Sequence, residues 1–335
     1  MFDRIGNPNP HRILDMLGVV PVINAGGPNT KHSGSRPRPE VLETMTEMAE
    51  AFVNIDEFLI ASGKEIAKLV NAESATITSG ASGGLVVQSA AAIARDNPKI
   101  IASLPITLGV PNELIIQKSQ RFIYDHLYLI PGAKFVEVGD ENGCDPQQVI
   151  DNITNMTAGI VHLESPFKNR GTVPLNQLVE IANGSDLPVL VDAASMLPPR
   201  ENLTKFTAQG ASLVSFSGGK AVRGPQSTGF LIGTPEWIEY ARLNNAPNPT
   251  AARAQKVSKE EIAGLITALK IFVNENESEE TKTYKTMMQK VVDQIIEIPG
   301  INTSVMHNYD HYIPHAVIDF NETWKGPDSD EIAKI

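Results

Sequence analysis

The stretch PVLVDAASMLPPRENLTKFTAQGASLVSFSGGK, residues 188–220, decides the fold. It opens with a β-branched apolar run, Pro188–Asp192, continues into a helical segment, Asn202–Ala208, and reaches a second apolar run, Ser212–Phe216. Strands that are continuously apolar and alternate with helices are typical of a mainly parallel sheet covered on both faces. We therefore predict an open α/β domain.

The same alternation continues along the chain from about residue 72 to residue 233. The other strand-like runs are Ser74–Thr78, Ile100–Ser103, Leu114–Gln117, Lys134–Val138, Gly159–Leu163 and Thr228–Ile232. The other helical segments are Gly83–Arg95, Gln120–Leu129, Pro146–Ile153 and Pro174–Ala182. We expect all of them to belong to this one domain.

The sequence on either side of this region is organised differently. Helical patterns start at Pro39, which suits the first turn of a helix, and at Asp56. A turn-rich linker at residues 244–250 leads to two helical patterns and two strand-like runs: Lys259–Val273, Glu279–Ile296, Ile301–Met306 and Ala316–Phe320. We predict an N-terminal segment, residues 1–55, that packs on the small domain or a dimer interface. A large domain, residues 56–245, and a smaller α+β domain, residues 246–335, follow it.

The sequence ends soon after a helix start. Asp328-Ser329-Asp330-Glu331 combines a capping side chain with acidic first-turn residues, but only Ile332–Ile335 follow. Four residues are too few for a stable helix. Either a short tail packs there, or the sequence is a fragment and its small domain is incomplete.

Composition and charge narrow the class of protein. Of the 335 residues, 41% are hydrophobic, and 28 Lys and Arg against 39 Asp and Glu leave a net charge of −11. These values fit a globular protein and argue against a general nucleic-acid binder, which needs cations to neutralise phosphates. A single cysteine, Cys144, excludes an internal disulfide. The sequence has neither a signal-peptide pattern nor an apolar run near the ~20 residues of a membrane span. We expect a cytoplasmic protein with no membrane partner.

The first candidate site is the turn Ser79-Gly80-Ala81-Ser82-Gly83-Gly84, between a strand-like run and an apolar helix. Small residues at such a turn leave backbone N–H groups and the positive helix end facing an anion, and a phosphate suits this place. The spacing does not match G-x-G-x-x-G, so a dinucleotide site is not specifically indicated. A plain tight turn is the alternative.

Two further candidates lie at the ends of strands. Asp192 closes a buried apolar run, where ligands collect in open α/β sheets; a helix cap or a salt bridge is the alternative. Lys220 follows Ser217-Gly218-Gly219 just past the next strand, and Ala221 in place of Ser or Thr argues against a Walker A site. A solvated loop lysine is the alternative. Together, a phosphate turn, a strand-end Asp and a loop Lys are the parts that pyridoxal phosphate requires.

Two longer runs carry a resemblance to a known family. Residues 192–203, DAASMLPPRENL, and residues 217–229, SGGKAVRGPQSTG, resemble the L-seryl-tRNA(Sec) selenium transferase-like family of fold-type-I pyridoxal-phosphate enzymes, in its D-glucosaminate-6-phosphate ammonia-lyase-like branch. Residues 22–27, VINAGG, followed by Gly34-Ser35-Arg36, look like the family's N-terminal motif, and Ser79-Gly80-Ala81 looks like its phosphate turn. The resemblance extends from about residue 20 to residue 320 and implies an aspartate aminotransferase-like large domain.

The resemblance also implies roles for individual residues. Lys220 is expected to form the Schiff base with the cofactor, and Asp192 to pair with its pyridine nitrogen. Ser79, Gly80, Ala81 and Ser217 are expected to bind the cofactor's phosphate. Ala194 and His126 are expected to contact its ring, with Tyr124 as the second candidate for the stacking aromatic residue. Gln226 and Thr228 are expected to reach the phosphate of a neighbouring subunit, which implies a homodimer or a higher homo-oligomer. For both aromatic rings, packing or helix capping is the alternative.

Arginines and histidines form two weaker patterns. Guanidinium groups bind carboxylates or phosphates bidentately, and four arginines are candidates for this role: Arg36, Arg38, Arg170 and Arg223. We predict that Arg36 and Arg223 bind the substrate; a surface salt bridge is the alternative for each. Three histidines recur every four residues, His307, His311 and His315. Pro314 interrupts the helix that a metal-binding face would need, so we predict a loop and no metal.

The resemblance implies a reaction at the α-carbon of a small-molecule amine. We predict elimination or ammonia-lyase chemistry on an amino acid or amino-sugar acid, in which Lys220 also moves the proton. Selenium transfer to seryl-tRNA is the alternative within the family, but the acidic chain and a lead of only about twenty residues before the N-terminal motif disfavour tRNA as a partner. A non-catalytic binding or regulatory protein with the same fold is the third hypothesis.

Overall fold

The protein is described by a computed structural model that covers residues 10–165, 171–308 and 312–332. Its centre is a seven-stranded sheet with the strand order β1-β7-β6-β5-β4-β2-β3. The strands are β1 Ser74–Ser79, β2 Glu113–Gln117, β3 Lys134–Val138, β4 Thr157–Leu163, β5 Val189–Asp192, β6 Leu213–Ser217 and β7 Thr228–Gly233. β7 is antiparallel to both neighbours, β1 and β6, and the other neighbouring pairs are parallel. The predicted mainly parallel α/β sheet is confirmed.

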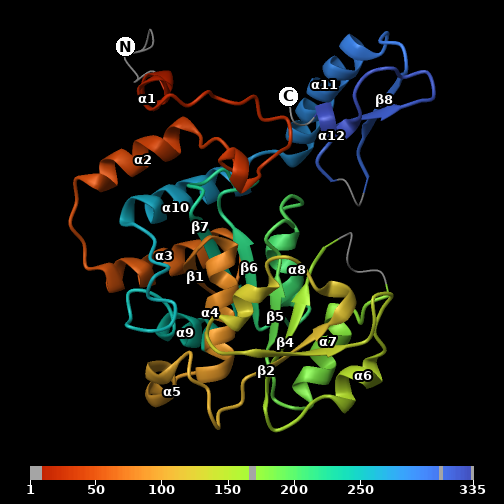
Figure 1. The fold of residues 1–335 in the computed structure, drawn as a ribbon. Helices are drawn as coiled ribbons and strands as arrows, with labels where there is room; N and C mark the ends of the chain where they lie inside the picture. Colours follow the sequence, from red (N-terminus) through yellow and green to blue (C-terminus); the bar gives the residue numbers. More distant parts are fainter. Residues whose placement is uncertain (1–9, 166–170, 309–311, 333–335) are drawn as a thin grey trace.

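Helices cover both faces of this sheet (Figure 1). In β5, Val189 and Val191 belong to the hydrophobic core on one face, whereas Leu190 belongs to the core on the other. Successive side chains of a strand point to opposite faces, so a continuously apolar strand is buried on both sides. The helices of this region are α3 Ile55–Leu69, α4 Gly80–Ala94, α5 Pro98–Ser103, α6 Pro146–Asp151, α7 Leu175–Asn183, α8 Asn202–Ala208 and α9 Pro235–Leu243.

Helix α4 is buried along its length and begins at the predicted phosphate turn. Gly84 brings it close to β6, because a Cβ at this position would lie 2.2 Å from the Oγ of Ser215. The buried Gln88 side chain donates hydrogen bonds of 3.1 Å to the carbonyls of Val191 and Leu213, and Tyr128 Oη donates to Gln88 Oε1 at 3.1 Å. These contacts hold the helix and its N-terminus against the strands that carry the other candidate residues.

One predicted strand is wrong. Ile100–Ser103 has β-branched residues, but the segment forms the helix α5. The side chain of Asn97 accepts hydrogen bonds from the N–H groups of Lys99 and Ile100, and Pro98 occupies the first helical turn. The cap and the proline outweigh the β propensity of two isoleucines.

One predicted helix is also wrong. Gln120–Leu129 contains only short 3-10 helices, η2 Lys118–Gln120 and η3 Asp125–Leu129. The carboxylate of Asp125 accepts a hydrogen bond from Phe122 N–H at 3.0 Å and pairs with Arg121. A side chain that bonds to nearby backbone groups in this way competes with continuous helix formation.

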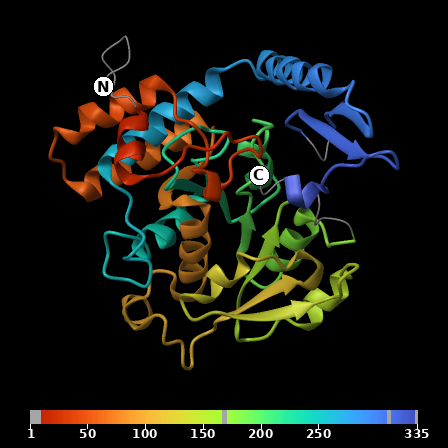
Figure 2. The ribbon, with the colours of Figure 1, turned by 45° about the horizontal axis from the view of Figure 1, so that its top comes forward.

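The remaining elements lie before and after the sheet region. They are α1 Pro10–Leu17, η1 Thr30–His32, α2 Pro39–Ala49, α10 Lys259–Asn274, α11 Glu277–Ile295, β8 Ile301–Met306, β9 His315–Phe320 and α12 Ser329–Ile332. α10 packs against α2 and α3 and contributes to the same core as the sheet, whereas α11 packs on the antiparallel β8–β9 hairpin. α11 and the hairpin lie beyond one end of the sheet (Figure 2). The predicted domain limits at residues 55 and 245 stay a prediction.

Within the described ranges, none of the helices combines the length and the apolar character needed to cross a membrane.

Candidate active site

A pocket lies at the edge of the sheet where β4 and β5 end. These strands and β6 are parallel, so their carboxyl ends meet at this edge, where ligands bind in open α/β sheets. The pocket has a volume of about 560 Å³, and its lining includes Asp192, Ala194, Ser195 and Lys220. The structure therefore brings both predicted catalytic residues, Asp192 and Lys220, and the predicted ring contact, Ala194, into one cavity.

Asp192 is the last residue of β5 and only 4% exposed. Burial raises the pKa of its carboxyl group from 3.8 to about 6, although the Ala194 N–H and the charge of Lys220 oppose this rise. The Ala194 N–H donates to Oδ1 at 2.9 Å. Because an ionised carboxylate in this position is costly, a cationic partner in the pocket would stabilise it.

Lys220 faces the same pocket from the turn after β6. Its Nζ donates a hydrogen bond of 2.6 Å to the Oγ of Ser195. Burial lowers the pKa of the amine, and the charge of Asp192 acts in the opposite direction. An amine with a lowered pKa is more often neutral near pH 7, which favours nucleophilic and base chemistry.

Glycines before the lysine let its turn pack tightly. A Cβ at Gly218 would lie 2.4 Å from Thr228 Oγ1, and one at Gly219 would lie 2.5 Å from the Cα of Gln226. The carbonyl of Gly219 accepts hydrogen bonds from both the N–H and the Oγ of Ser35, at 3.1 and 2.9 Å. The N-terminal Gly34-Ser35-Arg36 motif thus lies against the lysine turn, although 184 residues separate Ser35 from Gly219.

The predicted phosphate-binding residues lie on both sides of β7: Ser79 on β1 and Ser217 on β6, with Gly80 and Ala81 at the start of α4. Ser79 is the register partner of Thr228 across β1 and β7, and Ser217 is the partner of Gly229 across β6 and β7. Gly80 opens α4 with a φ of +65°, and a Cβ added to it would meet no atom within 4 Å. Ser215 Oγ donates to the carbonyl of Ala81 at 3.1 Å.

Ser79 and Ser217 lie at the carboxyl ends of their strands, at the same edge of the sheet as the pocket. None of the predicted phosphate-binding residues lines the pocket itself. The Oγ1 of Thr228 donates to Pro225 O at 2.6 Å, and Gln226 is exposed next to Gly34. The predicted contact of Gln226 and Thr228 with a neighbouring subunit's phosphate stays a prediction.

Aromatic residues line the pocket, but His126 is not among them. Its Nδ1 lies 2.9 Å from Ile123 O, and its side chain is exposed. Tyr124 and Phe122 do line the pocket, with ring centroids 6.4 Å apart in an edge-to-face arrangement. Of the two candidates for the ring contact, Tyr124 lines the pocket and His126 does not, and the contact itself stays a prediction.

The two predicted substrate-binding arginines contact each other outside this pocket. Arg223 Nε donates to the carbonyl of Arg36 at 3.0 Å, and Arg223 has a positive φ of 60°. Arg38 is buried and pairs with Glu275. Arg170 lies outside the described residues. The role of Arg36 and Arg223 in substrate binding stays a prediction.

Glu164 is a pocket residue that the sequence analysis missed. Its N–H donates to the carbonyl of Asp192 at 2.9 Å, and its Oε2 lies 3.1 Å from Nε2 of the buried His162. Glu164 directly follows β4, the strand beside β5. Its position after a buried apolar run is the same signal that identified Asp192. Tyr312 also lines the pocket from the loop before β9, and no sequence pattern marks it.

No group of three or more His, Cys, Asp or Glu side chains is arranged to hold a metal ion in the ranges that the structure describes. His315 is the register partner of Met306 across β8 and β9, His307 directly follows β8, and His311 lies outside those ranges.

Comparison with known proteins gives consistent matches. A family model of L-seryl-tRNA selenium transferase matches residues 40–298. The chain is 32% identical over 298 residues to a D-glucosaminate-6-phosphate ammonia lyase of Salmonella typhimurium strain 14028s, an alignment that covers 88% of this chain and 78% of that protein. It is 30% identical over 293 residues to a 5'-C-glycyluridine monooxygenase-decarboxylase of a Streptomyces species, with 85% of this chain and 71% of that protein covered.

A solved structure of a D-glucosaminate-6-phosphate ammonia-lyase has a TM-score of 0.84 and 29% identity to this chain, and the superposition covers 97% of this chain and 86% of the other. These matches confirm the resemblance, the fold class and the prediction of an enzyme with lyase or transferase relatives.

Proposed function

Because the chain belongs to the L-seryl-tRNA selenium transferase family, we propose that it is a pyridoxal-phosphate-dependent enzyme acting at the α-carbon of an amino acid or amino-sugar acid. The observation that carries this proposal is the meeting of Asp192 and Lys220 in one pocket at the carboxyl ends of parallel strands. The reaction we propose is elimination of ammonia.

The residues around the pocket fit this cofactor. Burial raises the pKa of the Asp192 carboxyl group, so its ionised form needs a cationic partner to stabilise it. The protonated pyridine nitrogen of the cofactor is such a partner. The open space at Gly80 and the positive end of α4 suit a phosphate. When bound, pyridoxal phosphate supplies an acceptor for the negative charge that develops when a bond to the α-carbon breaks.

Lys220 has two tasks in this proposal. Its amine holds the cofactor covalently, and it then moves a proton at the substrate's α-carbon. Burial lowers the pKa of this amine, so that more of it is neutral and able to accept a proton near pH 7. A hydrogen bond of 2.6 Å to Ser195 Oγ holds the amine in the pocket that both residues line.

The substrate class follows from the relatives. The ammonia lyase of Salmonella typhimurium is named for an amino-sugar acid, and the solved lyase structure covers nearly the whole chain. Phe122 and Tyr124 give the pocket an aromatic wall, and Glu164, Ser165 and Ser195 give it polar groups that suit a hydroxylated substrate.

A second candidate is selenium transfer to seryl-tRNA, which the family match favours. A protein that binds tRNA neutralises phosphates with Lys and Arg, whereas this chain has a net charge of −11. We expect no retention of radiolabelled tRNA by the protein in a filter-binding assay at low or physiological salt. Binding that weakens steeply with added salt would favour selenium transfer instead.

We also propose a homo-oligomer. Four apolar side chains close together in the N-terminal segment are exposed: Val19, Val20, Val22 and Ile23. A continuous group of exposed apolar side chains is typical of an interaction surface. Sedimentation of the purified protein should give a dimer or larger at micromolar concentration, and a monomer there would contradict the proposal.

The central experiment is cofactor trapping. The protein is reconstituted with pyridoxal phosphate, reduced with borohydride and digested, and the labelled peptide is identified by mass spectrometry. We expect the label on Lys220. Lys205 lines the same pocket and is the matched control. The Lys220→Ala protein should lose the reducible chromophore and the Lys205→Ala protein should keep it; a chromophore retained without Lys220 would refute the assignment.

A further inference from the structure

The hydroxyl group of Ser195 lies beside the amine that the proposed function uses. Lys220 Nζ donates a hydrogen bond of 2.6 Å to Ser195 Oγ, and both residues line the pocket. Among the residues that the structure describes, this amine has no other hydrogen-bond partner. Ser195 is therefore the group best placed to exchange a proton with Lys220.

The turn after β5 fixes the position of Ser195. The N–H of Met196 donates to the carbonyl of Ala193 at 3.0 Å, which closes the turn around Ser195. The N–H of Ala193 donates to Ser215 O at 3.0 Å, and the side-chain amide of Asn202 donates to Met196 O at 2.6 Å. The turn is thus tied to β6 on one side and to α8 on the other, so regular elements hold Ser195 in place.

The proton of the Ser195 hydroxyl is available to a molecule in the pocket. A hydroxyl group can accept one hydrogen bond and donate another at the same time. Ser195 Oγ accepts from the Lys220 amine, and within the described ranges its O–H donates to no protein group. The residue is exposed and lines the pocket. Ser195 can thus take a proton from Lys220 and give its own proton to a bound substrate.

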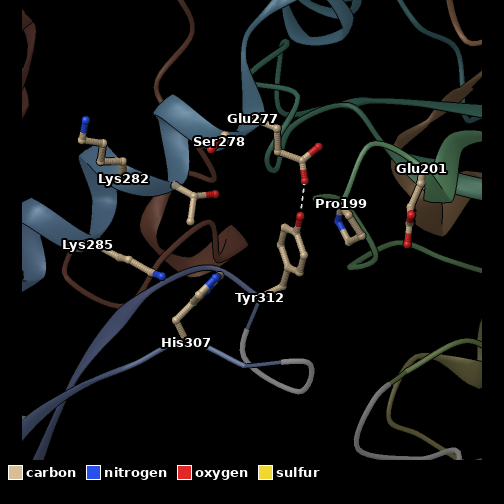
Figure 3. A pocket seen from close by; sticks show the side chains of 9 residues that line it. Pro199, Glu201, Glu277, Ser278, Lys282, Lys285, His307 and Tyr312 are labelled. Atoms are coloured by element: carbon tan, nitrogen blue, oxygen red, sulfur yellow. Dashed lines mark hydrogen bonds between the residues drawn. The ribbon is translucent and has the colours of Figure 1, made fainter.

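Two other polar groups of the pocket are engaged elsewhere. The hydroxyl of Tyr312 donates to the carboxylate of Glu277, as Figure 3 shows, and burial and Glu277 raise its pKa to about 12. The carboxylate of Glu164 lies 3.1 Å from Nε2 of the buried His162. Both groups would have to break these contacts to serve a substrate. Ser195, in contrast, is a pocket hydroxyl that contacts the reactive amine directly.

We propose that Ser195 is a catalytic residue that relays a proton between Lys220 and the hydroxyl that leaves the β-carbon of the substrate. The hydrogen bond of 2.6 Å between the two side chains, in one pocket, carries this inference. The relay requires a substrate whose β-carbon bears a hydroxyl, as that of an amino-sugar acid does. The inference rests on the proposed function, because it requires an elimination that starts at the α-carbon.

The step balances without any further reactant. The neutral amine of Lys220 takes the proton of the α-carbon, and the electron pair of that bond forms the double bond to the β-carbon. The bond between the β-carbon and its oxygen breaks, and its electron pair leaves with the oxygen. Ser195 gives its proton to this oxygen, so that water departs, and it receives a proton from the Lys220 ammonium group. Both residues return to their first state, and hydrolysis of the unsaturated amine releases ammonia.

The test separates removal of the α-proton from loss of the hydroxyl. The probes are D-glucosaminate 6-phosphate and serine, an amino-sugar acid and an amino acid that each have a hydroxyl on the β-carbon. The holoenzyme is incubated with them in heavy water, where nuclear magnetic resonance reports exchange of the α-proton and a coupled assay reports ammonia. We expect Ser195→Ala to slow ammonia release at least about 100-fold and to lower α-proton exchange less than about threefold. The ratio of exchange to release should therefore rise at least about thirtyfold.

Three further variants complete the test. Ser195→Thr keeps the hydroxyl, so its ratio of exchange to release should stay close to that of the wild type even if both rates fall. Lys220→Ala should lose exchange and release together. Ser185→Ala changes an exposed serine outside the pocket and should alter neither rate. Borohydride trapping at Lys220 is repeated in both Ser195 variants to show that the cofactor site is intact.

The outcomes separate this inference from the proposed function. The relay is overturned if Ser195→Ala lowers exchange and release by the same factor, changes neither rate, or no longer traps the cofactor. It is also overturned if Ser195→Thr shows the same raised ratio as Ser195→Ala. In each of these cases the wild type still reacts, so the proposed function stands. A wild type that releases no ammonia from either probe, or that is not trapped at Lys220, would refute the proposed function and the relay with it.

Discussion

Replacing Asp192 by asparagine tests the electrostatics of the pocket in the protein without cofactor. The folded carboxyl group has a pKa of about 6, compared with 3.8 in its ordinary state, because it is buried. The folded protein therefore holds this proton more tightly than the unfolded chain, and stability decreases as the pH rises from about 3.8 to about 6. Asparagine does not ionise, so the stability of the Asp192→Asn variant does not decrease for this reason as the pH rises.

The magnitude follows from the two pKa values. A rise from 3.8 to about 6 corresponds to about 3 kcal/mol of unfolding free energy once the pH exceeds both values. At pH 5 the folded carboxyl group is mostly protonated, and the loss is only about 1.5 kcal/mol. We expect the Asp192→Asn apoprotein to be about 3 kcal/mol more stable than the wild type at pH 7.5, with about half that advantage at pH 5.

The assay is urea unfolding of both apoproteins at the two pH values, followed by circular dichroism. Asp319→Asn, which changes an exposed carboxylate on β9, is the control and should stay within about 0.5 kcal/mol of the wild type. Added pyridoxal phosphate should raise the urea midpoint of the wild type more than that of Asp192→Asn. The reasoning is refuted if the Asp192→Asn protein is no more stable than the wild type at pH 7.5. It is also refuted if the difference in unfolding free energy between the two proteins is the same at both pH values.

Three substitutions probe the packing that positions the site. Arg200→Ala leaves a cluster of carboxylates on α11 without their cation and should cost about 3 kcal/mol of stability by urea unfolding. Gly63→Ala puts a Cβ 2.4 Å from the carbonyl oxygen of Ala75, so α3 must shift, and we expect a loss of about 1–3 kcal/mol in the same assay. Tyr128→Phe removes the donor to buried Gln88 and should lower stability by about 1–2 kcal/mol in thermal unfolding.

The first two substitutions have matched controls. Arg242→Ala breaks an exposed ion pair with Glu239 and should cost less than about 1 kcal/mol. Gly26→Ala adds a Cβ whose nearest neighbour is 3.8 Å away and should be near neutral. If Arg200→Ala or Gly63→Ala lowers the unfolding free energy no more than its control does, the packing argument for that position is wrong. A Tyr128→Phe protein as stable as the wild type would show that the Gln88 hydrogen bond contributes nothing.

The strands of the sheet were predictable because burial on both faces demands continuous apolar runs. Lys134–Val138 was predicted to the residue, and most other strands differ from the prediction by one or two residues at an end. Ile100–Ser103 was mistaken because an apolar run of four residues has no clear period. The N-cap of Asn97 and the proline after it were the stronger signal.

The candidate site was partly predictable for a similar reason. Asp192 and Lys220 each follow an apolar run directly, and parallel strands bring such positions to one edge. His126 and Tyr124 occupy an irregular segment of 3-10 turns, where no helical or strand period indicates which ring faces inward. The contribution of Tyr312 to the pocket was beyond prediction, because this residue comes from the loop before β9, far along the chain from β5 and β6.

By itself, the sequence determined the mainly parallel sheet and the family motifs, because each depends on residues close together along the chain. Only the tertiary structure decided which side chains share a cavity. Tyr312 and Lys220 line one pocket although the first comes from the loop before β9 and the second from the turn after β6. Local periodicity records which face of an element is buried, but it carries no information about which distant element covers that face.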